Sequence, residues 1–303
     1  MIRSQESGVG DQESTRRRPD SRLPISVPWL QALPLAAVVA IFLVIPILTL
    51  AVVSFWDYTD YDLIPTFELT NYTDLFGSWV TYATYASTLR FAALTWLFTV
   101  VIGFWIAYFL AFHVRSKTGQ MACFLVCTIP FLTSNVIRSI SWIPVLGRNG
   151  LVNSALLGLG AIDKPLEFLL FSDFSTVLSY VHLYVLFMVV PIFNTMMRID
   201  RSIIEAAVDA GATGWQIVRD VVIPLSKPGI AIGSIFVVTL VMGDFSTIRL
   251  MSGGQSASVG LLISNQLAYL QYPAAAANAM VLLAVVLCVV AAMMRVVDIR
   301  KEL

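Results

Sequence analysis

Residues 205–211 read Glu-Ala-Ala-Val-Asp-Ala-Gly, and Ile223-Pro224-Leu225 follows them. Both lie in a polar segment, residues 198–228, which has an apolar run long enough to span a bilayer on each side. The segment predicts a structured loop held at a membrane surface. A loop that merely connects two spans is the simpler interpretation, and the local sequence leaves both open.

Two helix starts can be identified within this loop. Ser202 precedes Glu205 by three residues, and Thr213 precedes Gln216 by three, so each pair fits a capping box. Pro224 is expected to end the second helix, because proline lacks an N–H donor and clashes with the preceding turn. We therefore predict a short helix, a turn and a second short helix.

Small residues dominate the first helix and the turn. Gly211 is expected to take a positive φ angle, which a side chain would penalise. Ala206, Ala207 and Ala210, which flank Asp209, leave a helix face that another backbone can approach closely.

The composition excludes several classes of function. The chain has 303 residues, 58% hydrophobic and 13% charged, and a mean hydropathy of +0.81, whereas soluble domains carry about 25% charged residues. An all-helical, polytopic membrane bundle is therefore predicted. The zero net charge implies no general attraction to nucleic acid, and a DNA-reading helix-turn-helix would need a basic second helix, which Arg219 beside Asp220 does not supply.

No cofactor or metal is expected in this chain. It contains no Gly-x-x-x-x-Gly-Lys-Ser/Thr phosphate loop, so it is not its own P-loop ATPase. Its three cysteines lie in apolar runs with no metal-ligand spacing, and we expect no disulfide. No nucleophile constellation is present either, so no catalytic residue is predicted.

Hydropathy predicts six transmembrane helices. The chain is expected to divide into a disordered cytoplasmic tail (1–28), a first transmembrane helix (29–56), an external connection (57–86), a five-helix core (87–297) that contains the 198–228 loop, and a short cytoplasmic end (298–303). Within the core the spans are expected near 87–112, 120–142, 175–197, 229–251 and 274–297.

The distribution of basic residues predicts the orientation. Six spans place both termini on one side, together with the 198–228 loop. That side carries all Lys and Arg residues except Arg90, Arg138, Arg148, Lys164 and Arg249. By the positive-inside rule this side is the cytoplasm, where ATP is found.

Charged groups inside spans are functional candidates, because they are costly there. Arg138 and Asp244 are expected at similar depths, where they either form an ion pair or line the path of a polar solute. Other candidates for the path or for hydrogen bonds between helices are Ser134, Asn135, Trp142 and His182.

The loop resembles the EAA loop of the membrane subunits of ABC importers. The matching features are Glu-Ala-Ala, Gly211 and an aliphatic-x-aliphatic-Pro run, in which Val221 and Ile223 stand where the family usually has Ile and Leu. Three further stretches resemble the polyamine-type branch: Pro130 to Arg138 and on to Trp142, Gly150-Leu151-Val152-Asn153, and Gly243-Asp244-Phe245. The resemblance covers residues 85–295.

This resemblance implies a type I (MetI-like) permease fold in the bacterial cytoplasmic membrane. The first helix of the loop would be the coupling helix that docks on a separate ATPase, and the residues carried over to this role are Ser202, Glu205, Ala206, Ala207, Asp209, Ala210, Gly211 and Pro224. The implied partners are a second, different membrane subunit, two ATPases that bind ATP and Mg²⁺, and an external solute-binding protein. The implied solute is a polyamine such as spermidine or putrescine.

Two other function classes fit the sequence less well. An ion-coupled secondary transporter is the main alternative, but such folds commonly contain internal repeats, and no repeated halves are visible. A membrane-bound enzyme would need paired carboxylates or ligand clusters, which the sequence lacks.

Overall fold

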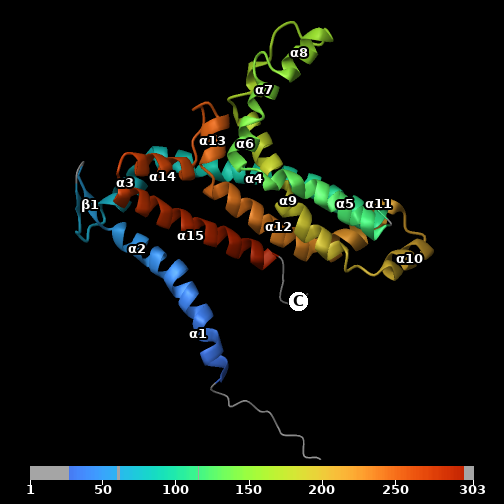
Figure 1. Ribbon diagram of the computed structural model, residues 1–303, viewed down its shortest axis with the longest axis horizontal. Helices are drawn as coiled ribbons and strands as arrows, with labels where there is room; N and C mark the ends of the chain where they lie inside the picture. The colour runs from blue at the N-terminus through green and yellow to red at the C-terminus, as the bar shows by residue number, and fades with distance from the viewer. Residues whose placement is uncertain (1–26, 60–61, 115, 297–303) are drawn as a thin grey trace, which may run out of the picture. The chain divides into compact units, whose positions relative to one another are not determined.

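The computed structural model describes residues 27–59, 62–114 and 116–296 (Figure 1). Regular structure in this part is almost entirely helical, so the predicted helical membrane bundle is confirmed. The tail expected over 1–28 and the end expected over 298–303 lie outside the described residues, except that Val27 and Pro28 already belong to the first helix.

The chain forms two compact units, and the boundary between them follows Thr49. The first contains α1 (Val27–Val39), the π-helical turn η1 (Ala40–Val44) and the start of α2 (Ile45–Val53). The apolar run Ala32–Val53 extends past this boundary in the sequence, is 22 residues long, enough to cross a bilayer, and lies within the expected first span 29–56.

The second unit begins with a small clamped substructure. The strands β1 (Asp57–Tyr58) and β2 (Leu63–Ile64) pair antiparallel, and α3 (Thr70–Gly77) follows. Asn71 of α3 donates from Nδ2 to the carbonyl oxygens of Ser54 at 3.1 Å and Trp56 at 2.8 Å. These bonds fix α3 to the chain that leaves α2.

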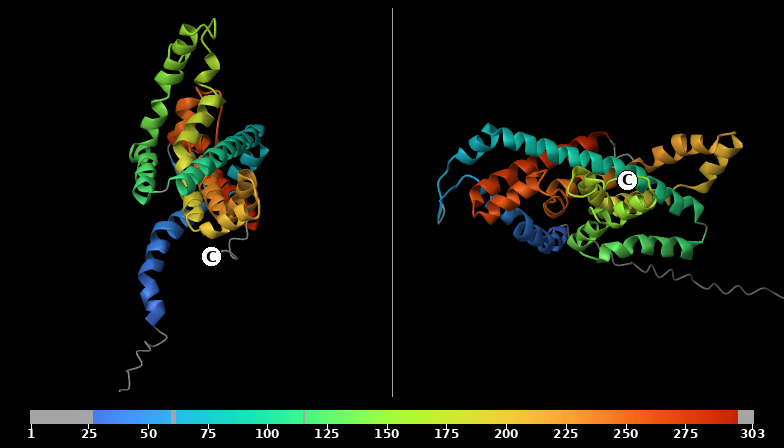
Figure 2. Two further views of the ribbon diagram at one scale, coloured as in Figure 1. Left: turned by 90° about the vertical axis from the view of Figure 1, so that its right-hand side faces the viewer. Right: turned by 90° about the horizontal axis from the view of Figure 1, so that it is seen from above.

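Four long helices form the body of the second unit (Figure 2). They are α4 (Trp79–Tyr108), α9 (Asp173–Met196), α12 (Ile223–Gly243) and α15 (Tyr272–Val296). The first three pack against one another, and α15 packs against α12. The helix α4 begins eight residues before the expected position 87 and is extended by the π-helical turn η2 (Phe109–His113).

Glycines allow α9 and α12 to approach closely. A Cβ atom on Gly229 would lie 2.5 Å from the carbonyl oxygen of Pro191, and one on Gly233 would lie 2.7 Å from Sδ of Met188. This small-xxx-small spacing brings helix backbones together in a membrane, where packing replaces the hydrophobic effect as the driving force.

The third span is broken, contrary to the straight helix expected over 120–142. The first limb consists of α5 (Lys117–Thr128) and the 3₁₀ turn η3 (Ile129–Leu132). The second limb, Asn135–Gly158, begins with α6 (Asn135–Ile140). The two limbs meet at a bend of 94°. Thr133 is extended, and its hydroxyl donates to the Pro130 carbonyl at 2.7 Å. Such local side-chain bonds satisfy the backbone outside a helix.

Short helices follow this bend. They are α7 (Ile143–Leu146), α8 (Leu151–Gly158) and the 3₁₀ turn η4 (Glu167–Leu169). Counting the bent pair as one span, the described residues contain up to six apolar segments long enough to cross a membrane.

The fifth span differs at both ends from the expected 229–251. One helical run extends from Gly214 through α11 (Gly214–Ile217), the π-helical turn η5 (Val218–Val222) and α12. Pro224 therefore does not end the second helix. It lies directly after the π-helical turn η5, and such local π adjustments supply other partners for backbone groups that a proline leaves without a hydrogen bond.

The same span stops earlier than expected. Asp244 and Phe245 interrupt the helix, and α13 (Ser246–Met251) and α14 (Val259–Ala268) follow as separate short helices. Asp244 is thus a helix-end residue and does not lie inside a continuous span.

Candidate functional site

The helix α10 (Arg201–Asp209) carries the loop pattern, but its cap differs from the predicted one. Asp200 is the N-cap, and its carboxylate accepts from the Ser202 amide at 3.0 Å. The predicted Ser202–Glu205 capping box is wrong, because the helix starts two residues earlier and places Glu205 in its second turn. Hydrogen bonds from Ser202 lower the pKa of Asp200 from its ordinary value.

The turn after α10 is a Schellman motif. Gly211 has φ +82°, as predicted. Its amide donates to Val208 O at 2.9 Å, and the amide of Ala212 donates to Ala207 O at 3.0 Å. A residue with a side chain is penalised at this φ angle, so the direction of the turn depends on the glycine.

The second capping box is confirmed. The Gln216 amide donates to Thr213 Oγ1 at 3.4 Å, and the Thr213 amide donates to Gln216 Oε1 at 2.7 Å. These reciprocal bonds start the run that continues into α12. The α11 end of the loop is therefore continuous with a helix that is long and apolar enough to span a membrane.

One face of this loop packs on the bundle and another is open. Ile204 and Ala207 contact the core of the chain. Ile203, Val208 and Trp215 are 44%, 55% and 62% exposed. Neither the cap at Asp200 nor this exposed apolar surface was predicted from the sequence. A tryptophan within a polar loop is the signal that could have indicated the surface.

The small residues predicted to form one face of the first loop helix are divided between the packed face and the open face. Ala206, Asp209 and Ala210 are exposed, whereas Ala207 is half-buried against the chain's own core. A partner helix or groove can therefore approach Ala206 and Ala210 but not Ala207.

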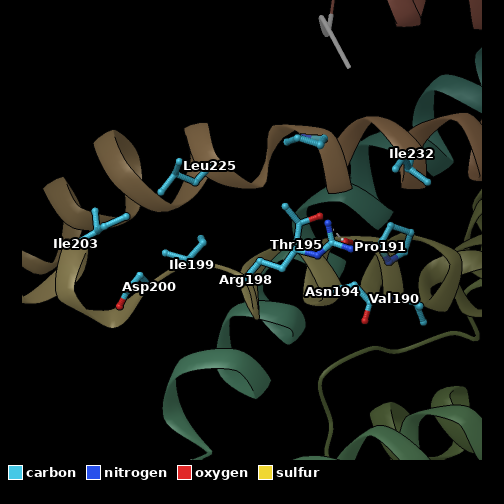
Figure 3. A pocket seen from close by; sticks show the side chains of 11 residues that line it. Val190, Pro191, Asn194, Thr195, Arg198, Ile199, Asp200, Ile203, Leu225 and Ile232 are labelled. Atoms are coloured by element: carbon cyan, nitrogen blue, oxygen red, sulfur yellow. Dashed lines mark hydrogen bonds between the residues drawn. The ribbon is translucent and has the colours of Figure 1, made fainter. Parts of the chain in front are cut away.

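A cavity of about 560 Å³ lies where α9, α10 and α12 meet (Figure 3). Asn194 and Thr195 of α9 and Arg198, which follows that helix, line it with Ile203 of α10 and Leu225 of α12. The loop is thus attached to the bundle along only part of its length, next to open space.

Asp244 forms a buried network with its neighbours. Tyr184 of α9 donates to its carboxylate at 2.8 Å, and Thr247 donates from its amide at 2.8 Å and from its hydroxyl at 3.1 Å. These bonds satisfy the carboxylate at the break between α12 and α13 without a cationic partner.

Arg138 is buried, but the expected ion pair with Asp244 is not formed between these two described residues. Its Nη2 donates to Asn135 Oδ1 at 2.5 Å, and its guanidinium lies 4.6 Å from the centre of the Phe131 ring. Nε and Nη1 are buried without a hydrogen-bond partner. The bend of the third span places Arg138 on the short helix α6, which packs against α9 and α13.

The side chains of His182 and Trp142 are in contact and are hydrogen-bonded to each other. Trp142 Nε1 donates to His182 Nδ1 at 3.0 Å. Ser179, one turn away on α9, donates to Ser139 at 3.2 Å. Ser134 is the N-cap residue of α6 but makes no side-chain cap bond. In the described ranges no group of three or more His, Cys, Asp and Glu residues could hold a metal ion.

Comparisons with known proteins agree with this geometry. Residues 103–301 match the family model described as binding-protein-dependent transport system inner membrane component. The spermidine/putrescine transport system permease protein PotB of Escherichia coli (strain K12) is 31% identical over 227 residues, 75% of this chain and 81% of that protein. The inner membrane ABC transporter permease protein YdcU of the same organism is 28% identical over 234 residues, 73% of each chain.

Solved structures show the same fold. A chain of a bacterial ABC transporter involved in the import of the acidic polysaccharide alginate has a TM-score of 0.72 at 22% identity, covering 90% of this chain and 96% of that one. A chain of the MetNI methionine ABC transporter in an inward-facing conformation has a TM-score of 0.51 at 19% identity, covering 71% of this chain and 92% of that one.

Proposed function

Because the chain belongs to the family of binding-protein-dependent transport system inner membrane components, and is an ABC importer permease, we propose that it imports a polyamine or a related small amino compound. The observation that carries the choice of solute is the 31% identity to a spermidine/putrescine permease over 75% of the chain. A fold shared with an alginate importer does not define a solute, because one fold hosts many substrates.

The permease has no catalytic role in this proposal. Separate ATPase subunits bind ATP and Mg²⁺, and their closure moves the α10–α11 loop. The exposed apolar residues Ile203, Val208 and Trp215 support docking in a groove, since aromatic and aliphatic anchors dominate protein interfaces. Motion then passes through the continuous run Gly214–Gly243 into the bundle.

The proposal includes a second, different permease chain and an external binding protein. The solute would pass between the two permeases, and the binding protein would deliver it. The two termini and the α10–α11 loop face the cytoplasm, which the excess of Lys and Arg on that side supports.

Cysteine labelling tests this orientation. We expect Ser202→Cys to react only with a reagent on the cytoplasmic side, and Ser154→Cys on α8 only with one outside; both serines are exposed. Labelling of Ser154→Cys from the cytoplasm would overturn the proposed topology.

Reconstitution tests the function. Proteoliposomes that contain the permeases and ATPases, with the binding protein added outside, should take up radiolabelled spermidine and hydrolyse ATP together. Gly211→Asp should lower uptake at least tenfold, because aspartate must hold φ near +82°. Gly214→Asp is the matched control: Gly214 has no positive φ, a Cβ there meets nothing within 4 Å, and uptake should stay within twofold.

A third variant probes the docking face. Ala206→Trp adds bulk to an exposed position of α10, so it should reduce copurification of the ATPases while the permease remains folded. Uptake that continues without any ATPase would instead identify an ion-driven transporter and overturn the proposal.

A further inference from the structure

An apolar groove lies between α4 and α9, both of which belong to the second unit. Its volume is about 300 Å³, and it lies toward the start of α9, at the opposite end of that helix from α10. Apolar side chains form its walls, including Leu94, Phe98 and Ile102 of α4 and Phe174 and Val181 of α9. No step of the transport cycle proposed above involves this α4–α9 groove.

The walls of the α4–α9 groove are open to the surroundings of the chain. Phe98, Ile102 and Phe174 are exposed, although each side chain is large and apolar. An exposed apolar surface of this kind indicates contact with a membrane or with another protein. The two ends of the groove separate these alternatives, because one end is charged and the other is obstructed.

An ion pair lies at the charged end. Asp173 lines the groove as the first residue of α9, and its Oδ2 pairs with Nη2 of Arg90, one turn before Leu94 on α4. Ser256 donates to the other carboxylate oxygen. The side chains of Arg90 and Asp173 are still 54% and 43% exposed. A guanidinium has five N–H donors, so Arg90 keeps donors for a second anion.

The chain's own α5 obstructs the other end. Trp105 and Phe109 continue the face of α4 that carries Phe98 and Ile102, because the spacings are three and four residues. There they line a second apolar groove together with residues of α5, among them Cys123. A straight helix that crosses the whole bilayer along this face would meet α5, whereas a chain confined to one leaflet would not.

The depth of the α4–α9 groove matches a single leaflet. Asp173 and Val181 are eight residues apart and Arg90 and Ile102 are twelve apart, which correspond to about 12 and 18 Å of helix. One leaflet contributes about 15 Å of hydrocarbon. When the apolar walls lie among acyl chains, the ion pair therefore lies at the level of the lipid headgroups.

We propose that the α4–α9 groove binds one phospholipid whose headgroup carries a phosphate and a primary ammonium, as in phosphatidylethanolamine. The phosphate accepts from the remaining N–H groups of Arg90, since a guanidinium matches phosphate oxygens in pairs. The ammonium donates to Asp173. Lipid tails are as apolar as the groove walls, so the headgroup contacts give the site its selectivity.

Native mass spectrometry of the purified complex of permeases and ATPases tests the site. After limited washing with detergent, we expect one phosphatidylethanolamine to remain bound. Ile102→Trp adds bulk inside the groove, and Arg90→Gln removes the partner of the phosphate. Each variant should lower the fraction of complexes that retain this lipid at least tenfold.

Two matched controls make the same changes outside the groove. Val101→Trp alters the exposed neighbour of Ile102, and Arg249→Gln removes another exposed arginine; neither residue lines the groove. Lipid retention should stay within twofold of the wild type in both. Equal losses in variants and controls would show unspecific adhesion of lipid and overturn the site. Thermal unfolding of each complex verifies that the variants fold.

The headgroup is tested by competition between two added lipids. Phosphatidylglycerol has the phosphate but no ammonium, so the wild type should retain phosphatidylethanolamine in preference to it. Asp173→Asn should abolish this preference while a lipid still binds, an outcome that a purely structural role of Asp173 does not predict. A wild type that prefers phosphatidylglycerol would overturn the headgroup assignment.

Photocrosslinking decides between a lipid and a protein in the groove. In native membranes, Phe98→p-benzoylphenylalanine should give an adduct with the mass of a phospholipid. A crosslink to the second permease would assign the groove to a contact between permeases and overturn the lipid site. In the proposed topology the lipid belongs to the outer leaflet. Retention of the lipid together with cytoplasmic labelling of Ser154→Cys would sustain the site and reject only that topology.

Discussion

Two regions of this protein use small residues to allow close approach, and only one of them is filled by the chain itself. At the α9–α12 interface, Gly229 and Gly233 lie against Pro191 and Met188 with no room for a methyl group. On α10, Ala206 and Ala210 face open space. The first region is complete in a single chain, and the second is an open surface to which we propose that an ATPase subunit binds.

Because of this difference, we expect substitutions in the two regions to affect different properties of the protein. An atom added to a filled interface strains the folded chain and lowers its stability, because protein interiors are close-packed. An open surface tolerates added atoms in the isolated chain and reveals their cost only when the partner binds. The two regions should therefore separate in stability measurements and in transport measurements.

Gly229→Ala should give the largest loss of stability. Its methyl group would lie 2.5 Å from a backbone oxygen of α9, so the helices must separate. Overpacking of this kind costs about 1–3 kcal/mol. Gly243→Ala, in the same helix with nothing within 4 Å, should change stability by less than about 1 kcal/mol. Thermal unfolding in detergent measures both, and equal losses would contradict the close-packing argument.

The next effect concerns the polar network beside the same interface. Tyr184 and Asp244 are hydrogen-bonded, so Tyr184→Phe and Asp244→Asn should be non-additive, with a coupling of about 1–2 kcal/mol. Arg138→Gln and Asp244→Asn should add to within about 0.5 kcal/mol, because the two residues have separate partners. Double-mutant cycles of thermal stability test both pairs. Strong coupling between Arg138 and Asp244 would restore the ion pair that the sequence predicts.

A smaller effect is expected at the turn of the open region. Gly211→Ala should destabilise α10 locally by about 1–2 kcal/mol, because a Cβ is penalised in the left-handed conformation. Hydrogen exchange of the α10 amides should accelerate, while the global unfolding temperature stays unchanged. Gly214→Ala is the control, and a fall in global stability with Gly211→Ala would show that the loop belongs to the same cooperative unit as the bundle.

The smallest effect is a pH dependence at the cap of α10. The pKa of Asp200 is lower in the folded chain than its ordinary value of about 3.9. Its capping contribution is therefore complete above that value and is lost as pH falls through the folded pKa. Protection of the first α10 amides should decrease below about pH 4. Asp200→Asn keeps a capping oxygen without titrating, so protection that still falls in this variant would assign the effect to another group.

Local patterns in the sequence predicted the loop well. The Thr213–Gln216 box and the positive φ of Gly211 follow from residues within a few positions of each other, and both are confirmed. The first cap was misplaced because Asp200 and Ser202 are both good capping residues, and the sequence alone does not say which one the helix begins after.

The membrane class was also evident from the sequence, because apolar length and charge scarcity require nothing beyond the chain's own composition. The breaks at Thr133 and Asp244 were not predicted. A run of apolar residues has the same hydropathy whether it forms one straight helix or two bent ones, and the choice depends on long-range partners.

What the sequence by itself determined is the membrane bundle, the loop with its turn and second cap, and the family resemblance. Only the tertiary structure decided that Asp244 bonds to Tyr184 rather than Arg138, and that Pro224 lies inside a continuous helix. The physical reason is distance along the chain. Caps and spans arise from neighbouring residues, whereas partners for buried charges and the walls of cavities come from segments that only folding brings together.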